Sequence, residues 1–276
     1  MKKISVFIFL SLLAATSFAL NPVREYAVLP SDFGLDYKEV TITATDGIKL
    51  NAWIFKSTTP DSKKMVVISD DGEGNMADNM EVIGQWLSLG YNVVAYDYRG
   101  YGKSEEFNIN QKFYIYAQFA KDLQGVLDYV RKTYSPGYVD LYGIGIGGGL
   151  SIGLGSSSGQ VRRVIADGPY VSLEDAKARI KQFKAQDLML PLAYDKNLIE
   201  PIYALKEGLN QDKLMGILLI AGQNEQIFGP DQMKQLQKIH PKNLQIYLVP
   251  NATNDKNLST NKDEYFNQVK KFVTGH

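Results

Sequence analysis

The chain has 276 residues, and its 30 basic and 30 acidic side chains give a formal net charge of +0. This balance produces no field that would draw the protein to nucleic acid or to an anionic membrane surface, so we expect neither as a partner. The sequence contains no cysteine, which excludes disulfide bonds and lipid attachment at a cysteine.

The first residues have the pattern of a secretory signal peptide. Met1-Lys2-Lys3 precedes an apolar run over 4–15, and Ser17-Phe18-Ala19 follows it. The run is shorter than the ~20 residues that a membrane span needs, although an uncleaved anchor is the alternative. The pattern predicts a signal peptide over 1–19 and a single domain over 20–276. The mature protein would be periplasmic or secreted, with no membrane span after cleavage, in a Gram-negative bacterium.

The next segments predict a β-sheet. Apolar residues alternate with polar ones over 40–42 and 48–54, with a turn at 45–47 between them, which indicates an antiparallel hairpin buried on one face. Short continuous apolar runs follow, and such runs are typical of strands buried on both faces. These runs lie at 65–68, 93–96, 139–144, 164–166, 217–220 and 246–249.

Helical periodicity separates these strands. Apolar residues repeat at helical spacing over 115–130, 233–239 and 265–272. Alternating strands and helices predict a mostly parallel sheet with helices on both faces. The segment 171–214 interrupts the alternation with helical patterns and no clear strand. It is either a small helical cap over a pocket or a surface insertion, since loops at the strand ends are where such sheets bind ligands.

Four blocks occur in a characteristic order along the chain. They lie at 67–75, 89–104, 143–147 and 219–225, and the second reads Gly-Tyr-x-Val-x-x-x-Asp-x-Arg-Gly-x-Gly-x-Ser. Together they resemble the α/β-hydrolase superfamily, in particular its serine-aminopeptidase-like and small esterase-like members. The resemblance implies an α/β-hydrolase fold over nearly the whole mature domain.

The third block resembles the nucleophile elbow Gly-x-Ser-x-Gly of these enzymes. Gly143 and Gly147 occupy the flanking positions, but Gly145 stands where the serine is expected, and glycine has no side chain to attack a substrate. Ser151 lies nearly two helical turns further on and points elsewhere. A dinucleotide-binding glycine loop is an alternative, but the mid-chain position and the flanking blocks disfavour it, so we expect no cofactor.

The resemblance also implies positions for the other catalytic groups. Glu225 matches the acid of a triad, and Asn254 falls where the histidine base is expected. An amide does not titrate near neutral pH and cannot act as the base. His240 precedes the last strand, at the opposite end of the sheet, and His276 ends the chain.

The first block resembles the oxyanion loop, with Asp71 in the place of the family's histidine. A carboxylate there would oppose the negative charge that develops during acyl transfer. Asp71, Glu73 and Asn75 could hold Ca²⁺ through alternating oxygen ligands, but the rest of a calcium loop is missing, so we expect no metal. Asp78 is predicted to cap a helix over 79–89.

The sequence therefore predicts an exported α/β-hydrolase-like protein that lacks serine-hydrolase activity and has no catalytic residues. Its former active site would bind a small molecule, a peptide or a protein. One alternative is an active hydrolase in which a residue such as Thr253 acts with Glu225 or a lysine. Another is an interaction protein with a collapsed pocket. We expect six residues to form the degenerate pocket: Gly145, Ile146, Asp71, Gly72, Glu225 and Asn254.

Overall fold

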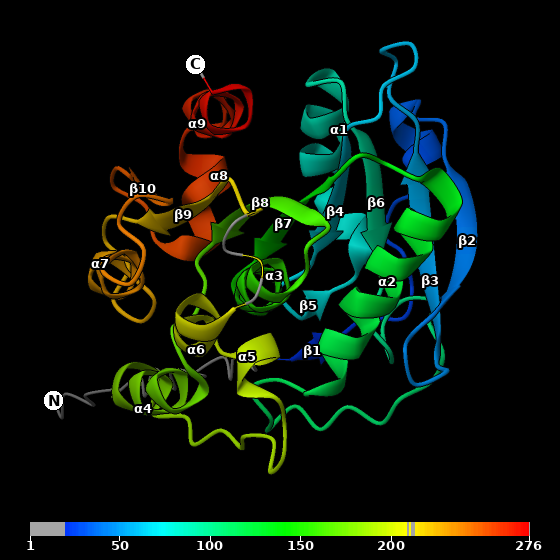
Figure 1. Ribbon diagram of the computed structural model, residues 1–276. Helices are drawn as coiled ribbons and strands as arrows, with labels where there is room; N and C mark the ends of the chain where they lie inside the picture. The colour runs from blue at the N-terminus through cyan, green and yellow to red at the C-terminus, as the bar shows by residue number, and fades with distance from the viewer. Residues whose placement is uncertain (1–19, 209, 211–212, 276) are drawn as a thin grey trace, which may run out of the picture.

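A computed structural model describes residues 20–208, 210 and 213–275. Its main sheet has the strand order β10-β9-β8-β7-β4-β6-β3-β2 (Figure 1). The β2–β3 and β3–β6 pairs are antiparallel and the others are parallel, which confirms the predicted hairpin and the mostly parallel sheet. The strands are β2 (Lys38–Thr43), β3 (Lys49–Phe55), β4 (Met65–Ser69), β6 (Asn92–Tyr96), β7 (Val139–Ile144), β8 (Val161–Asp167), β9 (Gly216–Gly222) and β10 (Leu244–Val249).

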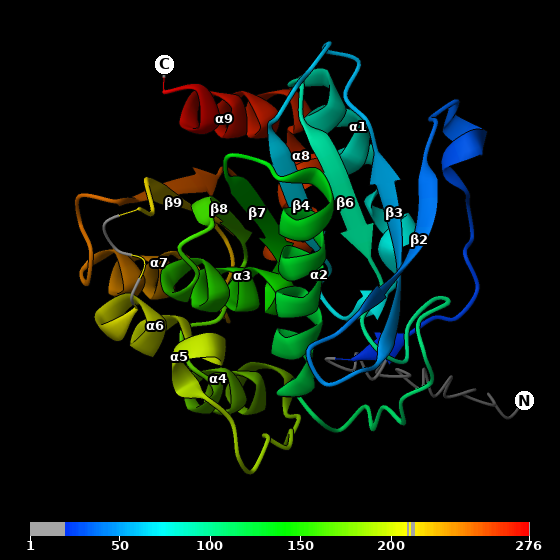
Figure 2. The same cartoon turned by 45° about the vertical axis from the view of Figure 1, so that its right-hand side comes forward.

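Helices cover both faces of this sheet (Figures 1 and 2). Each face has its own apolar core, because strands buried on both sides present alternate side chains to two helical layers. Helix α2, for example, buries Phe119, Leu123 and Val130, which recur at helical spacing. One layer contains α2 (Gln118–Tyr134), α3 (Gly145–Ser157) and α7 (Pro230–Gln237), and the other contains α1 (Met80–Ser88) and α9 (Lys262–Thr274).

The segment 171–214 forms a helical group beside α3. It contains α4 (Leu173–Lys184), α5 (Lys196–Ile199) and α6 (Pro201–Glu207), and no strand of the main sheet lies in its described part. The Ser172 hydroxyl caps α4 by accepting a hydrogen bond of 3.2 Å from the Asp175 amide. Figure 1 shows the three helices gathered at one end of the molecule.

The start of α1 differs from the prediction. A 3₁₀ turn over Met76–Asn79 precedes the helix, and Asn75 caps this turn by accepting a hydrogen bond of 3.1 Å from the Ala77 amide. Asp78 instead accepts a hydrogen bond of 3.0 Å from the Asn75 amide, so the prediction that Asp78 is the N-cap was wrong. The physical reason is a capping box, in which the third residue of the turn bonds back to the cap.

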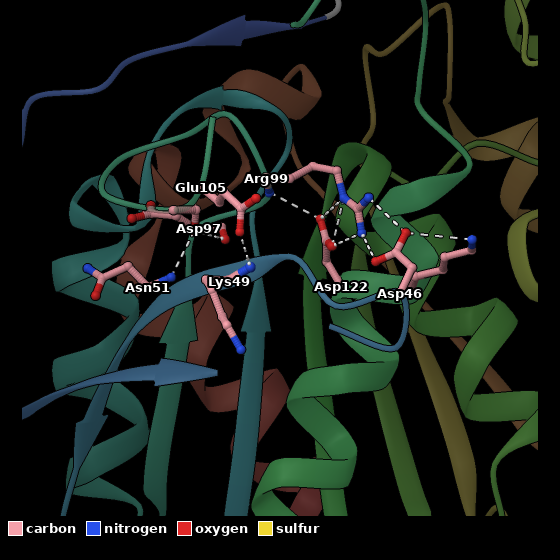
Figure 3. Close-up of polar contacts among 9 residues, drawn as sticks. Asp46, Lys49, Asn51, Asp97, Arg99, Glu105 and Asp122 are labelled. Atoms are coloured by element: carbon pink, nitrogen blue, oxygen red, sulfur yellow. Dashed lines mark hydrogen bonds and ion pairs between the residues drawn. The ribbon is translucent and has the colours of Figure 1, made fainter. Parts of the chain in front are cut away.

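Arg99, from the second block of the sequence, is an internal clamp (Figure 3). Its side chain is 2% exposed, and its guanidinium donates hydrogen bonds of 2.6–3.1 Å to Asp122 on α2. It also donates bonds of 2.8 and 2.9 Å to Asp46, in the turn between β2 and β3. Because a planar guanidinium can bind two carboxylates at once, Arg99 ties the hairpin to the helical layer.

Two further polar residues of this block, Asp97 and Ser104, are also buried. Asp97 accepts hydrogen bonds from the Met76 amide at 2.9 Å and from the Tyr26 hydroxyl. The Ser104 hydroxyl donates a hydrogen bond of 2.7 Å to the Asp97 carbonyl and accepts one of 2.8 Å from the Asn51 amide. The 97–104 loop is therefore a scaffold whose polar groups are satisfied by the protein itself.

The first described residues lie against the loop that follows β4. Strand β1 (Asn21–Pro22) pairs in parallel with β5 (Glu73–Gly74), and the Asn21 amide donates 2.8 Å to the Gly72 carbonyl. The predicted signal peptide, 1–19, lies outside the described residues. Across 20–275, leaving aside 209 and 211–212, no helix has the length and apolar character needed to cross a bilayer.

Candidate functional site

A cavity of about 650 Å³ opens at the carboxyl edge of the sheet. Residues at or after the ends of β4, β7, β8, β9 and β10 form its floor, and α4 with the loop that follows it forms part of its wall. Parallel strands place their carboxyl ends at one edge, which is why these distant segments meet. Five of the six predicted pocket residues line this cavity: Asp71, Gly145, Ile146, Glu225 and Asn254.

Gly72 is the exception among the six. It is buried, and its carbonyl accepts hydrogen bonds from the Asn21 amide at 2.8 Å and the Tyr101 hydroxyl at 2.9 Å. It does not line the cavity. The described N-terminal segment covers the position that the sequence assigned to the pocket.

The elbow keeps the backbone of a nucleophile turn. Strand β7 ends at Ile144, and α3 begins at Gly145, whose φ is 51°. A Cβ at Gly143 would lie 2.2 Å from the Gly147 carbonyl oxygen, and one at Gly147 would lie 2.3 Å from the Ser69 carbonyl oxygen. The flanking glycines are therefore required by backbone contacts.

Gly145 is constrained in a different way. The three atoms nearest to a Cβ added there all belong to Asp71. The Asp71 Cβ would lie 3.0 Å away, and the nearest backbone atom 3.5 Å away. The left-handed φ suits glycine and strains any other residue. The turn therefore accommodates glycine without strain, and the Asp71 side chain starts directly beside the vacant nucleophile position.

The oxyanion-like loop uses its own carboxylates to satisfy its amides. The Glu73 amide donates a hydrogen bond of 2.8 Å to Asp71 Oδ1, and the Gly72 amide donates one of 3.2 Å to Asp70 Oδ1. Asp70 Oδ2 also accepts 2.7 Å from the Asn79 side chain. An oxyanion hole needs amide donors aimed at a substrate oxygen, and these two amides already have internal acceptors.

Burial and mutual repulsion alter the acidity of these carboxyls. Burial raises the pKa of Asp70 well above its usual value, and the charge of Asp71 raises it further. Burial also raises the pKa of Asp71. Burial raises the pKa of Glu73 as well, and the charge of Asp71 raises it further. A cation placed among them would relieve this repulsion.

Glu225 and Asn254 bond to backbone groups of their own loops. Glu225 Oε1 accepts hydrogen bonds of 3.0 Å from the Gln226 amide and 2.7 Å from the Ile227 amide. Glu225 Oε2 accepts a hydrogen bond of 3.1 Å from the Asn254 amide. Asn254 Oδ1 accepts 2.9 Å from the Gly222 amide, and Nδ2 donates 3.2 Å to the Phe228 carbonyl. Where a triad would have an acid orienting a histidine, the chain has an acid and an amide that fix loop geometry.

The structure adds a polar network that the sequence analysis missed. Asp167, at the end of β8, lines the cavity. It accepts a hydrogen bond of 2.7 Å from the Tyr265 hydroxyl and one of 2.6 Å from the side-chain amide of Asn257. The hydroxyls of Tyr142 and Tyr265 lie 2.7 Å apart. Burial raises the pKa of Asp167 to about 6. An aspartate directly after the 164–166 strand was the signal that could have identified it.

Four other residues were candidates for a nucleophile or a base. Ser151 is fully buried within α3. His240 precedes β10 and contacts the Leu205 carbonyl at 2.5 Å, and it does not line the cavity, whereas His276 lies outside the described residues. Thr253 does line the cavity, and its hydroxyl donates 2.6 Å to Asp255.

The suggested calcium ligands do not converge. The Asn75 side chain donates hydrogen bonds of 3.2 and 2.8 Å to the Val23 and Glu25 carbonyls, and its oxygen accepts from Ala77. Its side chain therefore holds the N-terminal segment. In the described part of the chain, no group of three or more acidic or histidine side chains is arranged to hold a metal.

Comparisons with known proteins place the chain in a family. The model of the serine aminopeptidase S33 family matches residues 60–215, more than half of the sequence. Protein bem46 of Schizosaccharomyces pombe is 22% identical over 215 residues, which cover 76% of this chain and 68% of that protein. The uncharacterized protein YfhR of Escherichia coli is 24% identical over 245 residues, covering 86% and 80%.

Solved structures agree with this assignment at the level of the fold. The Pyrococcus furiosus esterase Pf2001 superposes with a TM-score of 0.70 at 21% identity, covering 92% of this chain and 98% of the esterase. The superposition covers most of both chains, which shows a shared fold. The chain therefore belongs to the serine aminopeptidase S33 family and has the α/β-hydrolase fold.

Proposed function

We propose that this protein has lost serine-hydrolase chemistry and uses the cavity at the carboxyl edge of its sheet to bind a ligand. The elbow carries the proposal. Its backbone retains the tight turn between β7 and α3, but Gly145 offers no nucleophile, and the Asp71 side chain stands beside it. A covalent route needs an attacking side chain and a base that accepts its proton.

The rest of the site supports the same conclusion. Asn254 stands at the base position and bonds to the Gly222 amide and the Phe228 carbonyl. The Gly72 and Glu73 amides are bonded to Asp70 and Asp71. Since losing a single oxyanion donor costs about 3 kcal/mol of transition-state stabilisation, these changes together oppose acyl transfer.

The proposal includes export and a cap. The charged and apolar pattern of 1–19 supports secretion to the periplasm or beyond. Ile180, Lys184 and Leu188, from the 171–214 segment, line the cavity, which supports a role for this segment as a cap over the ligand. The cavity volume falls within the range of about 300–1,000 Å³ that is typical of small-molecule sites.

One observation favours a second candidate function. The Thr253 hydroxyl lies in the cavity and donates 2.6 Å to Asp255. A hydroxyl paired with a carboxylate is a minimal nucleophile and base, so an active hydrolase built on Thr253 is the alternative.

Ester and amide turnover separates the two functions. We expect no hydrolysis of short-chain nitrophenyl esters or aminoacyl nitroanilides above the rate in buffer, with an active esterase of the same fold as the positive control. The Thr253→Val variant is the matched control, because valine keeps the branched shape and removes the hydroxyl. Turnover that Thr253→Val abolishes would overturn the proposed function and establish the alternative.

A further inference from the structure

The cavity is lined partly by charged side chains and partly by apolar and aromatic ones. Its apolar part includes Tyr114, Ile180, Leu188, Ile227 and Phe228. Its charged part contains one cationic side chain among the described lining residues, that of Lys184. The carboxylates that line it are Asp71, Glu73, Asp167, Glu225 and Asp255.

These carboxylates differ in how far the protein satisfies them. Glu225 accepts three backbone hydrogen bonds, and Asp167 accepts two from side chains. Glu73 is exposed, and no described residue donates a hydrogen bond to its carboxylate. Asp71, next to it, accepts one from the Glu73 amide. Glu73 and Asp71 thus retain acceptor capacity toward the cavity.

A second, independent observation comes from the apolar wall. Tyr114 is 3% exposed and lines the cavity, and no described residue forms a hydrogen bond with its hydroxyl. This oxygen is not among the fully enclosed polar atoms without a partner, so it opens to the cavity. Burial raises the pKa of Tyr114, and the charge of Asp175 raises it further. This hydroxyl is therefore available to form a hydrogen bond with a polar group on a ligand.

We infer that the cavity binds an organic cation with an apolar body, with the cationic head at Glu73 and Asp71 and the body against the wall that contains Tyr114. This inference rests on the proposed function and adds the chemical class of the ligand. The repulsion among the carboxyls disfavours an anion. Burial and the charge of Asp71 raise the pKa of Glu73, whereas the charge of Lys184 lowers it, so this one cation offsets only part of the acidic lining.

Calorimetric titration with three matched probes tests the inference. Phenethylamine carries the cation, whereas 2-phenylethanol is neutral and phenylacetate is an anion with the same ring. At low ionic strength we expect phenethylamine to bind at least about tenfold more tightly than either of the others, which corresponds to one effective charge pair. Equal or tighter binding of phenylacetate or 2-phenylethanol, or no binding of phenethylamine, would overturn the inference.

Two variants locate the cationic head. Glu73→Gln should weaken phenethylamine about tenfold and leave 2-phenylethanol unchanged, because only the cation loses its partner. Asp231→Asn is the matched control, since it removes the same charge from an exposed residue at the start of α7. Equal losses in the two variants would mean that only the net charge matters, which contradicts a head site at Glu73.

A third variant tests the apolar wall. Tyr114→Phe should weaken tyramine several-fold and leave phenethylamine unchanged, since only tyramine has a ring hydroxyl that can pair with Tyr114. Identical affinities of tyramine for the wild type and the variant would contradict the placement of the body. Failure of these binding tests leaves the absence of ester hydrolysis unaffected, so the ligand class and the proposed function fail separately.

Discussion

Two loops leave neighbouring strands at the same edge of the sheet, 97–104 after β6 and 70–74 after β4. The first matches the family pattern, and Asp97, Arg99 and Ser104 all bond within the protein. The second departs from the pattern at Asp71, and its amides bond to its own carboxylates. The loop that holds the backbone together is retained, and the loop that would stabilise a substrate's charge is altered.

The same contrast divides the elbow. Gly143 and Gly147 pack against backbone atoms that leave no room for a side chain, whereas Gly145 faces the cavity. A residue with internal contacts is needed for folding whether or not the protein is an enzyme. A residue whose partner would be a substrate is free to change once catalysis is lost.

Replacement of the buried clamp should have the largest effect on stability. Arg99→Met leaves the Asp122 carboxylate buried without its partner, and we expect a loss of about 3–5 kcal/mol in the free energy of unfolding. Lys103→Met is the control, because its ion pair with Glu39 is exposed and should contribute less than about 1 kcal/mol. Urea unfolding measures both. Similar losses in the two variants would contradict the role of the 97–104 loop as a scaffold.

The acidic floor should make stability depend on pH in an unusual direction. The pKa of Asp167 is raised to about 6 when folded, so the folded state holds this proton more tightly than the unfolded state. Its contribution to stability is therefore largest at low pH, decreases as pH rises toward 6 and is fully lost above it. Between pH 4 and 7 the wild type should lose up to about 3 kcal/mol relative to Asp167→Asn.

Urea unfolding of both proteins at several pH values tests this dependence. Comparing the two proteins isolates Asp167, because the other titrating groups are common to both. A stability difference that does not change between pH 4 and 7 would show that burial does not raise the pKa of this carboxyl.

An added methyl group at a flanking glycine should disturb the elbow. In Gly147→Ala the Cβ would lie 2.3 Å from the Ser69 carbonyl oxygen, so we expect a loss of about 1–3 kcal/mol from overpacking. Gly84→Ala is the matched control, since no atom lies within 4 Å of the position in α1 and alanine favours helix by up to about 1 kcal/mol. Thermal unfolding that ranks Gly147→Ala above the wild type would contradict the packing argument.

Introducing a serine alone at the elbow should lower stability modestly and give no activity. In Gly145→Ser the new Cβ would lie 3.0 Å from the Asp71 Cβ, so Asp71 must shift slightly, and the serine must adopt a positive φ at a cost of about 1–2 kcal/mol. Without a base at 254 the hydroxyl remains a weak nucleophile. Ester turnover by Gly145→Ser above that of the wild type would show that the rest of the site is still functional.

The fold could be predicted from the sequence because it depends on local periodicity. Alternation over 48–54 predicted β3, and helical spacing over 115–130 predicted α2. The cap of α1 was predicted wrongly, since whether Asn75 or Asp78 bonds to the first free amide depends on the local turn geometry.

The site was predictable only in part. The residues at Gly145 and Asn254 could be assigned by their position in the family pattern. The bonds of Asp71 and Glu225 to loop amides depend on backbone conformation, which the pattern does not contain. The contact of Asp167 with Tyr265 joins residues 98 positions apart and follows only from the packing of α9 on the sheet.

We propose that this hydrolase scaffold lacks a reactive nucleophile. Labelling of the wild-type protein with a fluorophosphonate, followed by intact-protein mass spectrometry, tests this proposal. We expect an unmodified mass under conditions that fully label an active esterase of the same fold. A stoichiometric adduct on Thr253 or on any serine would contradict it, and the modified residue would identify the true catalytic site.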